Sequence, residues 1–195
     1  SGGQISEYRA WQNSLQYMRN VLDDKEIPDE SNIAIEYQIP RTSLRVDFII
    51  AGADRENCNN IVIIELKQWE KAEIIAEEMQ HSVKAFTGGA NRTVSHPSYQ
   101  AYSYAVCIRN SSEQVQDENI GVIPCAFLHN YNPKYVDVLS NPIYQTWYEE
   151  APFFIKDQIL DLRNFIKKYI TMKSSDGQLL YKIDNGRIRP SKSLQ

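Results

Sequence analysis

The stretches RVDFIIAG (residues 45–52) and IVIIELKQW (residues 61–69) decide how this chain folds. Both are apolar runs rich in β-branched residues, and the polar segment ADRENCNN (residues 53–60) joins them. Two such runs with a short polar connection predict an antiparallel hairpin. Because both runs are almost continuously hydrophobic, we expect the hairpin to lie in the middle of a sheet that is covered on both faces.

Hydrophobic periodicity predicts the remaining elements. We expect helices at 7–22, 97–110 and 156–170, strands at 33–39 and 119–130, and a short hairpin at 83–95 that turns at Gly88-Gly89. In the first strand, alternation with polar residues predicts a half-buried strand with Ile33, Ile35, Tyr37 and Ile39 on one face. Residues 70–82 fit either one or two helical turns or an ordered loop. This order predicts an α/β fold, αβββαβ with a C-terminal helix, in which a central mixed β-sheet is flanked by helices.

Length and charge distribution bound the domain organisation. With 195 residues, the chain is most simply one domain with a sizeable core. We assign residues 1–3 to an expression scar, residues 4–172 to the domain, and residues 173–195 to an extended exit segment and basic linker toward a further domain. Residues 162–195 hold eight basic and two acidic side chains, a local charge of +6. A solvated helix face followed by a linker explains this charge more simply than a binding patch.

Composition excludes several classes of protein. The net charge of −4 argues against a protein that depends on overall positive charge to hold nucleic acid. No apolar run is long enough to predict a transmembrane helix. The three cysteines lie far apart and form neither a CxxC metal motif nor a disulfide framework, so a reducing cytoplasm is the expected location.

Three ionisable residues, Asp47, Glu65 and Lys67, interrupt the two central runs. An isolated buried charge is costly, so these residues either pair with one another or form a site. Glu65 and Lys67 point to the same face because alternate residues of a strand do so. Hairpin pairing would bring Asp47 beside Glu65, and a divalent cation would relieve the repulsion between the two carboxylates. With the Leu66 carbonyl these oxygens suit Mg²⁺, and Lys67 would hold an attacking water.

These residues resemble the motif of the PD-(D/E)xK nuclease superfamily, in which an aspartate on one core strand is followed by ExK on the next. Val46 stands where that motif often has proline. The resemblance implies a restriction-endonuclease-like core and a Mg²⁺- or Mn²⁺-dependent phosphodiesterase that cuts nucleic acid, usually DNA. Asp47, Glu65 and the Leu66 carbonyl would then hold the metal, with Lys67 beside them.

A second motif, QAYSY at residues 100–104, is similar to the QxxxY element of the RecB-like branch of that superfamily. The resemblance implies that Gln100 and Tyr104 lie beside the site and help to position it or its substrate. It also implies a further carboxylate from the first helix, for which Glu7 is the candidate and Glu36 the competitor. A plain helix N-terminal glutamate stabilised by the helix dipole explains Glu7 equally well.

Other residues near these motifs have two interpretations each. His96 is either a contact to metal or phosphate or an ordinary histidine at a helix N-terminus. The rings of Trp69 and Tyr99 would stack on bases or belong to the core. Five cations flank the expected site and would neutralise phosphates, although surface solubility explains any one of them as well: Arg45, Lys71, Arg41, Lys84 and Arg92.

The whole chain resembles nuclease modules at the start of larger bacterial proteins that continue into a helicase-type ATPase. This resemblance implies a helicase-nuclease in DNA processing or in defence against phage. The alternative is a catalytically inactive module of the same fold that binds nucleic acid or docks a protein. In that case Lys67 forms a structural salt bridge with Asp47 or Glu65.

Overall fold

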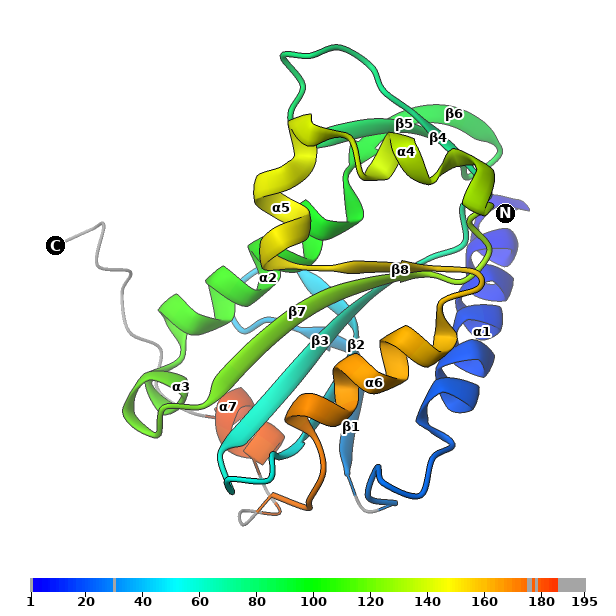
Figure 1. Cartoon of the computed structure of the whole chain (residues 1–195). Coiled ribbons are helices and arrows are strands. Elements are labelled where there is room, and N and C mark those ends of the chain that lie inside the picture. Colours follow the sequence, from blue (N-terminus) through cyan, green and yellow to red (C-terminus); the bar gives the residue numbers. More distant parts are fainter. Residues whose placement is uncertain (1, 30, 175–176, 178, 186–195) are drawn as a thin grey trace, which may run out of the picture.

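The structure, a computed structural model, describes residues 2–29, 31–174, 177 and 179–185, and the side chains of these residues except 2–11 and 185. Its centre is a five-stranded mixed sheet (Figure 1). In spatial order the strands are β1 (Asn32–Gln38), β2 (Arg45–Ala53), β3 (Asn59–Lys67), β7 (Gly121–Leu128) and β8 (Phe153–Ile155). Strand β2 is antiparallel to both of its neighbours, β1 and β3, whereas β7 and β8 run parallel to β3. The predicted central hairpin and mixed sheet are confirmed.

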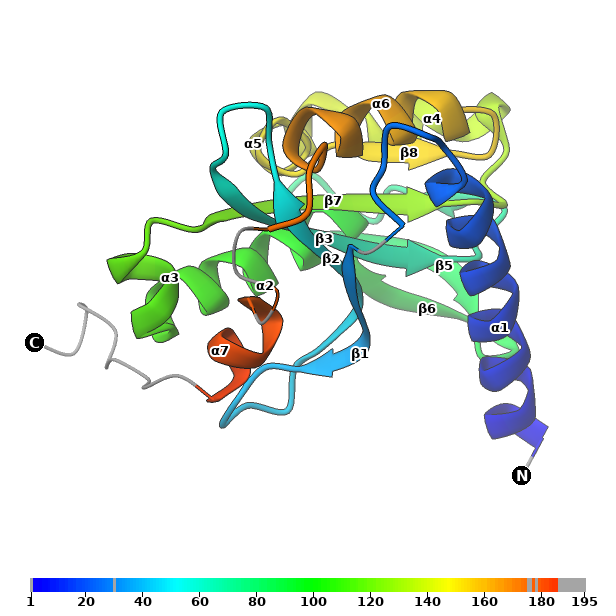
Figure 2. The same cartoon turned by 90° about the horizontal axis from the view of Figure 1, so that it is seen from below.

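Helices cover both faces of this sheet. On one face, α1 (Gly2–Leu22) and α6 (Ile159–Tyr169) share a core with the sheet, to which α1 contributes Met18 and α6 contributes Leu162. On the other face lie α2 (Pro97–Ser111) and α7 (Leu179–Asn185). Figure 2 shows α6 and α2 on opposite sides of the sheet. The predicted α/β class with flanking helices is therefore confirmed.

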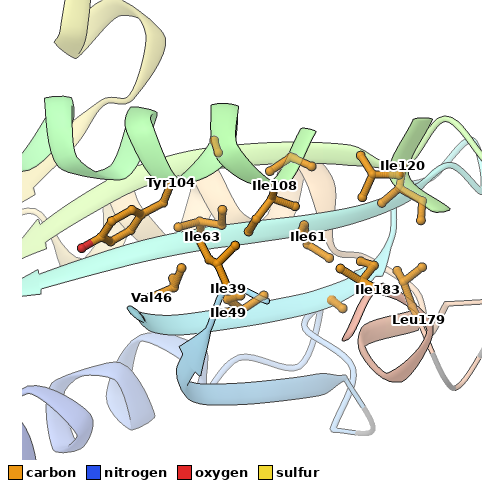
Figure 3. Packing of buried hydrophobic residues seen from close by; sticks show 14 residues of the cluster. Ile39, Val46, Ile49, Ile61, Ile63, Tyr104, Ile108, Ile120, Leu179 and Ile183 are labelled. Atoms are coloured by element: carbon orange, nitrogen blue, oxygen red, sulfur yellow. The ribbon is translucent and has the colours of Figure 1, made fainter. Parts of the chain in front are cut away.

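Strand β3 is almost continuously apolar because it is buried on both faces. Ile61 and Ile63 pack toward α2, while Val62 and Ile64 pack toward α1 and α6. Figure 3 shows the α2 side of the core, with Tyr104 at one end. The same alternation places Glu65 and Lys67, at the end of the strand, on the side of α2.

A second, three-stranded sheet lies between β3 and α2 in the chain. It consists of β4 (Ala72–Glu73), β5 (Ser82–Thr87) and β6 (Ala90–Ser95). The predicted turn at Gly88-Gly89 is confirmed, and the two glycines have φ angles of 58° and 79° that other residues rarely adopt. Of the two possibilities for 70–82, the structure has the non-helical one, with a two-residue strand followed by loop and turns.

The first strand differs from the prediction. Ile33 and Ile35 are 48% and 44% exposed, whereas Tyr37 and Ile39 pack in the core on the α2 side. The reason is a positive φ of 50° at Glu36, which breaks the regular pleat between Ile35 and Tyr37. Ile33 and Ile35 therefore pair with Ile50 and Phe48, which face the opposite core.

The extended conformation predicted for residues 173–195 is wrong at 179–185, which form α7. Leu179 is fully buried and Ile183 is 6% exposed, and both pack into the α2-side core. The packed part of the chain therefore reaches beyond residue 172. Residues 186–195 of the predicted linker lie outside the described residues.

Several short elements between α2 and α6 were not predicted. They are α3 (Glu113–Asp117), a 3-10 turn at Pro133–Tyr135, α4 (Val136–Leu139), a 3-10 turn at Pro142–Tyr144, α5 (Gln145–Glu150) and strand β8. Both 3-10 turns begin at an Asn-Pro pair, where Asn132 and Asn141 each accept a hydrogen bond from the backbone N–H two residues on. None of the described helices is both long and apolar enough to cross a membrane.

Candidate active site

The site lies where strands β2 and β3 separate. Their paired register ends at Phe48 and Ile64, so that Asp47 and Glu65 occupy the next position on each strand. Beyond this point the side chain of Asp47, rather than the backbone of β2, bonds to β3, because its Oδ2 accepts a hydrogen bond of 2.8 Å from the Leu66 N–H. The predicted proximity of the two strand ends is thus present, and Asp47 is fixed by the backbone of the neighbouring strand.

Glu65 is a buried carboxylate with one oxygen satisfied. Only 2% of the residue is exposed, and its Oε1 accepts a hydrogen bond of 2.8 Å from Lys67 Nζ. Within the described residues, no hydrogen-bond donor contacts Oε2. Burial raises the pKa of Glu65 to about 8, and the nearby negative charge of Asp47 acts in the same direction, against the opposing effect of Lys67.

Lys67 is enclosed by groups that favour its charged form. Burial disfavours the ammonium, but the carboxylates of Glu65 and Asp47 outweigh that effect and raise the pKa of Lys67. Its Nζ also lies 5.6 Å from the centre of the Trp69 ring. The ammonium is therefore held beside the carboxylate pair by an ion pair on one side and an aromatic face on another.

Helix α2 brings Gln100 and Tyr104 to the same place. The two residues lie one helical turn apart, and Gln100 Nε2 donates a hydrogen bond of 2.8 Å to the Tyr104 hydroxyl. Burial raises the pKa of Tyr104, and the charge of Glu65 adds to the effect. Both helix residues line the same groove as Asp47 and Glu65, so they lie beside the site as predicted.

An open groove of about 1320 Å³ runs past these side chains. All of the predicted site residues with described side chains line it: Asp47, Glu65, Leu66, Lys67, Gln100, Tyr104, Arg45 and Lys71. Residues from segments far apart in the sequence therefore meet in a single concave surface.

The structure separates other candidates from this groove. Glu36 does not line it and instead lies 3.8 Å from Arg45, with both side chains about half exposed. Arg41, Lys84 and Arg92 are likewise not among the residues that line it. Glu7 belongs to α1, but its side chain lies outside the described residues.

His96 is not part of the site. It is fully buried at the start of α2, where its Nδ1 accepts a hydrogen bond from the Ser98 N–H and its Nε2 donates one to the Leu139 carbonyl. Burial lowers the pKa of His96 to about 4. Both bonds fit one neutral tautomer, so the interpretation as an ordinary helix N-terminal histidine is confirmed.

The two aromatic candidates line the groove but also pack in the interior. Trp69 is 7% exposed and belongs to the core beneath the second sheet. The ring of Tyr99 contacts Trp147 and His81, at 4.8 and 5.0 Å between ring centres. Both rings are therefore already engaged by the protein.

The β5–β6 hairpin forms one wall of the groove, with Phe86, Thr87 and Thr93 in its lining. This wall was not predicted from the sequence. The hairpin itself was predicted, but nothing in the sequence shows that residues 70–82 return it to the end of β3. Ser14 of α1 and Asn130, which follows β7, also line the groove and carry no recognisable motif.

The donor set fits a hard divalent cation. Mg²⁺ is bound in proteins through one or two carboxylates and keeps several waters. Here two carboxylates adjoin each other, and Glu65 Oε2, which has no donor among the described residues, is a buried acceptor that a cation would satisfy. In the described part of the chain, no group of three or more His, Cys, Asp and Glu side chains is arranged to hold a metal. The fit therefore rests on the two carboxylates and the backbone.

Comparison of the chain with protein-family models, with curated proteins and with solved structures finds no match.

Proposed function

We propose that this chain is a metal-dependent nuclease domain with the site of the PD-(D/E)xK superfamily. It would hydrolyse phosphodiester bonds in nucleic acid, with DNA as the expected substrate. The observation that carries the proposal is the buried Glu65 carboxylate beside the partly buried Asp47, with the ammonium of Lys67 next to it and, within the described residues, no donor on Glu65 Oε2. A buried site of this kind costs stability unless something fills it.

The roles of the residues follow from their placement. Asp47, Glu65 and the Leu66 carbonyl would hold Mg²⁺ or Mn²⁺, since the N–H and C=O of a strand residue point to the same side and the Leu66 N–H faces Asp47. The bound ion would lower the pKa of a coordinated water and neutralise charge on the phosphate. Lys67 donates hydrogen bonds to the attacking water and to a phosphate oxygen.

The remaining groove residues bind and orient the substrate. Gln100 holds the Tyr104 hydroxyl by a direct hydrogen bond, which fixes the edge of the site against α2. Arg45 and Lys71 lie in the groove lining and supply positive charge for the phosphates on either side of the cleaved bond. These cations position the strand and do not read its sequence.

Cleavage by matched variants tests this proposal. With a mixture of labelled DNA strands and Mg²⁺ or Mn²⁺, Glu65→Gln and Lys67→Met are expected to lower the cleavage rate by at least about 100-fold, the scale of a lost proton-transfer or orienting group. Glu36→Gln is the control, because Glu36 is a strand carboxylate outside the groove. Circular dichroism and thermal melting verify that each variant is folded. Wild-type-like cleavage by both site variants would exclude the proposed mechanism.

A second candidate is a catalytically inactive module of the same fold that binds nucleic acid or docks a protein. The observation that favours it is the Lys67–Glu65 ion pair of 2.8 Å, which gives the Lys67 ammonium and Glu65 Oε1 a partner without any ligand. The two candidates differ in whether Asp47 and Glu65 bind a divalent cation, and calorimetric titration with Mn²⁺ separates them.

On the same resemblance we further propose a bacterial cytoplasmic protein in which this domain belongs to a longer polypeptide with a helicase-type ATPase, acting in DNA processing or phage defence. An ATPase of that kind would deliver strands to the groove. This context would be supported if the full-length protein both unwinds and cleaves DNA, and if Glu65→Gln loses cleavage but keeps unwinding.

A further inference from the structure

The β5–β6 hairpin presents an exposed aromatic ring to the groove. Within β5 the side chains alternate, so that Val83 and Ala85 pack into the core and Phe86 does not. Phe86 is 60% exposed and lines the groove. Among the described residues, no other aromatic ring contacts Phe86, in contrast to Tyr99, whose ring is engaged by Trp147.

The tip of the hairpin leaves space beside this ring. A side chain at Gly89 would meet no atom within 4 Å, and the Arg92 guanidinium lies next to Gly88. The backbone of the tip is thus accessible to a bound chain, with one cation beside it. Lys84 stands opposite Glu73 in the strand register and is not among the residues that line the groove, whereas Phe86 is.

The charges of the groove lining argue for a single strand. Among the groove residues whose side chains the structure describes, the cations Arg45, Lys67 and Lys71 are matched by the acidic residues Asp47, Glu65 and Glu70. A surface that holds a duplex in register neutralises several phosphates on two backbones and therefore has a large excess of positive charge. Proteins that bind single strands obtain much of their affinity from aromatic side chains on which bases stack.

We infer that Phe86 is a base-stacking residue that holds single-stranded nucleic acid in the groove, one wall of which is the β5–β6 hairpin. The inference rests on the proposed nuclease function and adds the form of its substrate. An unpaired base stacks on the exposed Phe86 ring, which orients the strand so that its backbone passes Asp47 and Glu65. Phe86 contacts the substrate away from the reacting phosphate, so the direct effect of its loss is weaker binding of the strand.

Equilibrium binding tests this role separately from cleavage. Fluorescence anisotropy is measured with a labelled single-stranded oligodeoxynucleotide in Ca²⁺, with the same oligonucleotide as a duplex, and with a version that carries a stretch of abasic sites. Phe86→Ala is expected to weaken single-strand binding roughly 5- to 150-fold, the range that stacking of one base is worth. Phe86→Trp, which keeps a stacking face, should retain affinity. Leu160→Ala is the matched control, because Leu160 is 66% exposed but does not line the groove.

The oligonucleotide without bases identifies stacking as the cause. Wild-type protein should bind it as weakly as Phe86→Ala does, and Phe86→Ala should lose little further affinity for it. Equal binding of the normal strand by wild type and Phe86→Ala, or tighter binding of the duplex than of the single strand, would overturn the inference. Either result would leave the nuclease proposal standing if Glu65→Gln still abolishes cleavage. Conversely, stacking by Phe86 without any metal-dependent cleavage would remove the nuclease proposal and leave a single-strand binding site.

Discussion

At the scale of single residues, the ion pair of Glu65 and Lys67 is not explained by its contribution to stability. Replacing a buried ion pair by apolar groups of similar volume is often neutral or stabilising, so Glu65 and Lys67 are weak contributors to folding. Their positions could be predicted from the sequence because charges inside buried strands demand a partner. The bond from the Leu66 N–H to Asp47 could not, because it depends on where β2 and β3 stop pairing.

Divalent-cation binding is the prediction that belongs to this scale. Calorimetric titration with Mn²⁺ should show binding by wild type, and Glu65→Gln should weaken it at least tenfold because one of two carboxylate ligands is lost. Glu70→Gln is the matched control, since Glu70 lines the same groove outside the carboxylate pair. No heat of binding to wild-type protein would favour the inactive module.

At the scale of secondary-structure elements, prediction succeeded where one pattern persists over many residues. The runs that form β2 and β3 are long and buried on both faces, so their hydrophobicity alone identifies them. Strand β8 has only three residues, and α7 buries two large side chains over a single turn. Such elements depend on packing against the finished sheet, which a local pattern does not reveal.

The start of α2 offers a pH-dependent prediction. His96 has a pKa of about 4 in the folded protein against an ordinary value near 6.5, so its contribution is complete above pH 6.5 and is lost as the pH falls toward 4. Urea unfolding should therefore show that the difference in unfolding free energy between wild type and His96→Asn shrinks by about 2 kcal/mol from pH 7.5 to pH 5.

Comparison with the variant is needed here because the pKa of His129 is also lowered to about 4 by burial and contributes to the acid sensitivity of both proteins. Asparagine at position 96 keeps a side-chain acceptor for the helix N-terminus. A difference between the two proteins that stays constant over this pH range would show that His96 does not titrate as the buried environment requires.

At the scale of the whole molecule, the two faces of the sheet have separate cores, and the C-terminal part of the chain completes one of them. On the α2 side, Leu179 and Ile183 extend the cluster that holds Tyr104 at its other end (Figure 3). The site is thus the exposed end of a core that α7 helps to fill. The prediction of a linker at residues 173–195 did not include this packing, because the short apolar segment in the middle of the tail is flanked by basic residues.

The contribution of α7 to stability follows from that packing. Leu179 is fully buried, so Leu179→Ala should lower the unfolding free energy by about 2–5 kcal/mol, the cost of a cavity in a packed core. Tyr181→Ala on the same helix is the control, because Tyr181 is 65% exposed and its loss should change stability by less than about 0.5 kcal/mol. Both are measured by urea unfolding of the complete chain. If the two variants were equally stable, α7 would be an appendage of the domain, and the α2-side core would have to be complete without it.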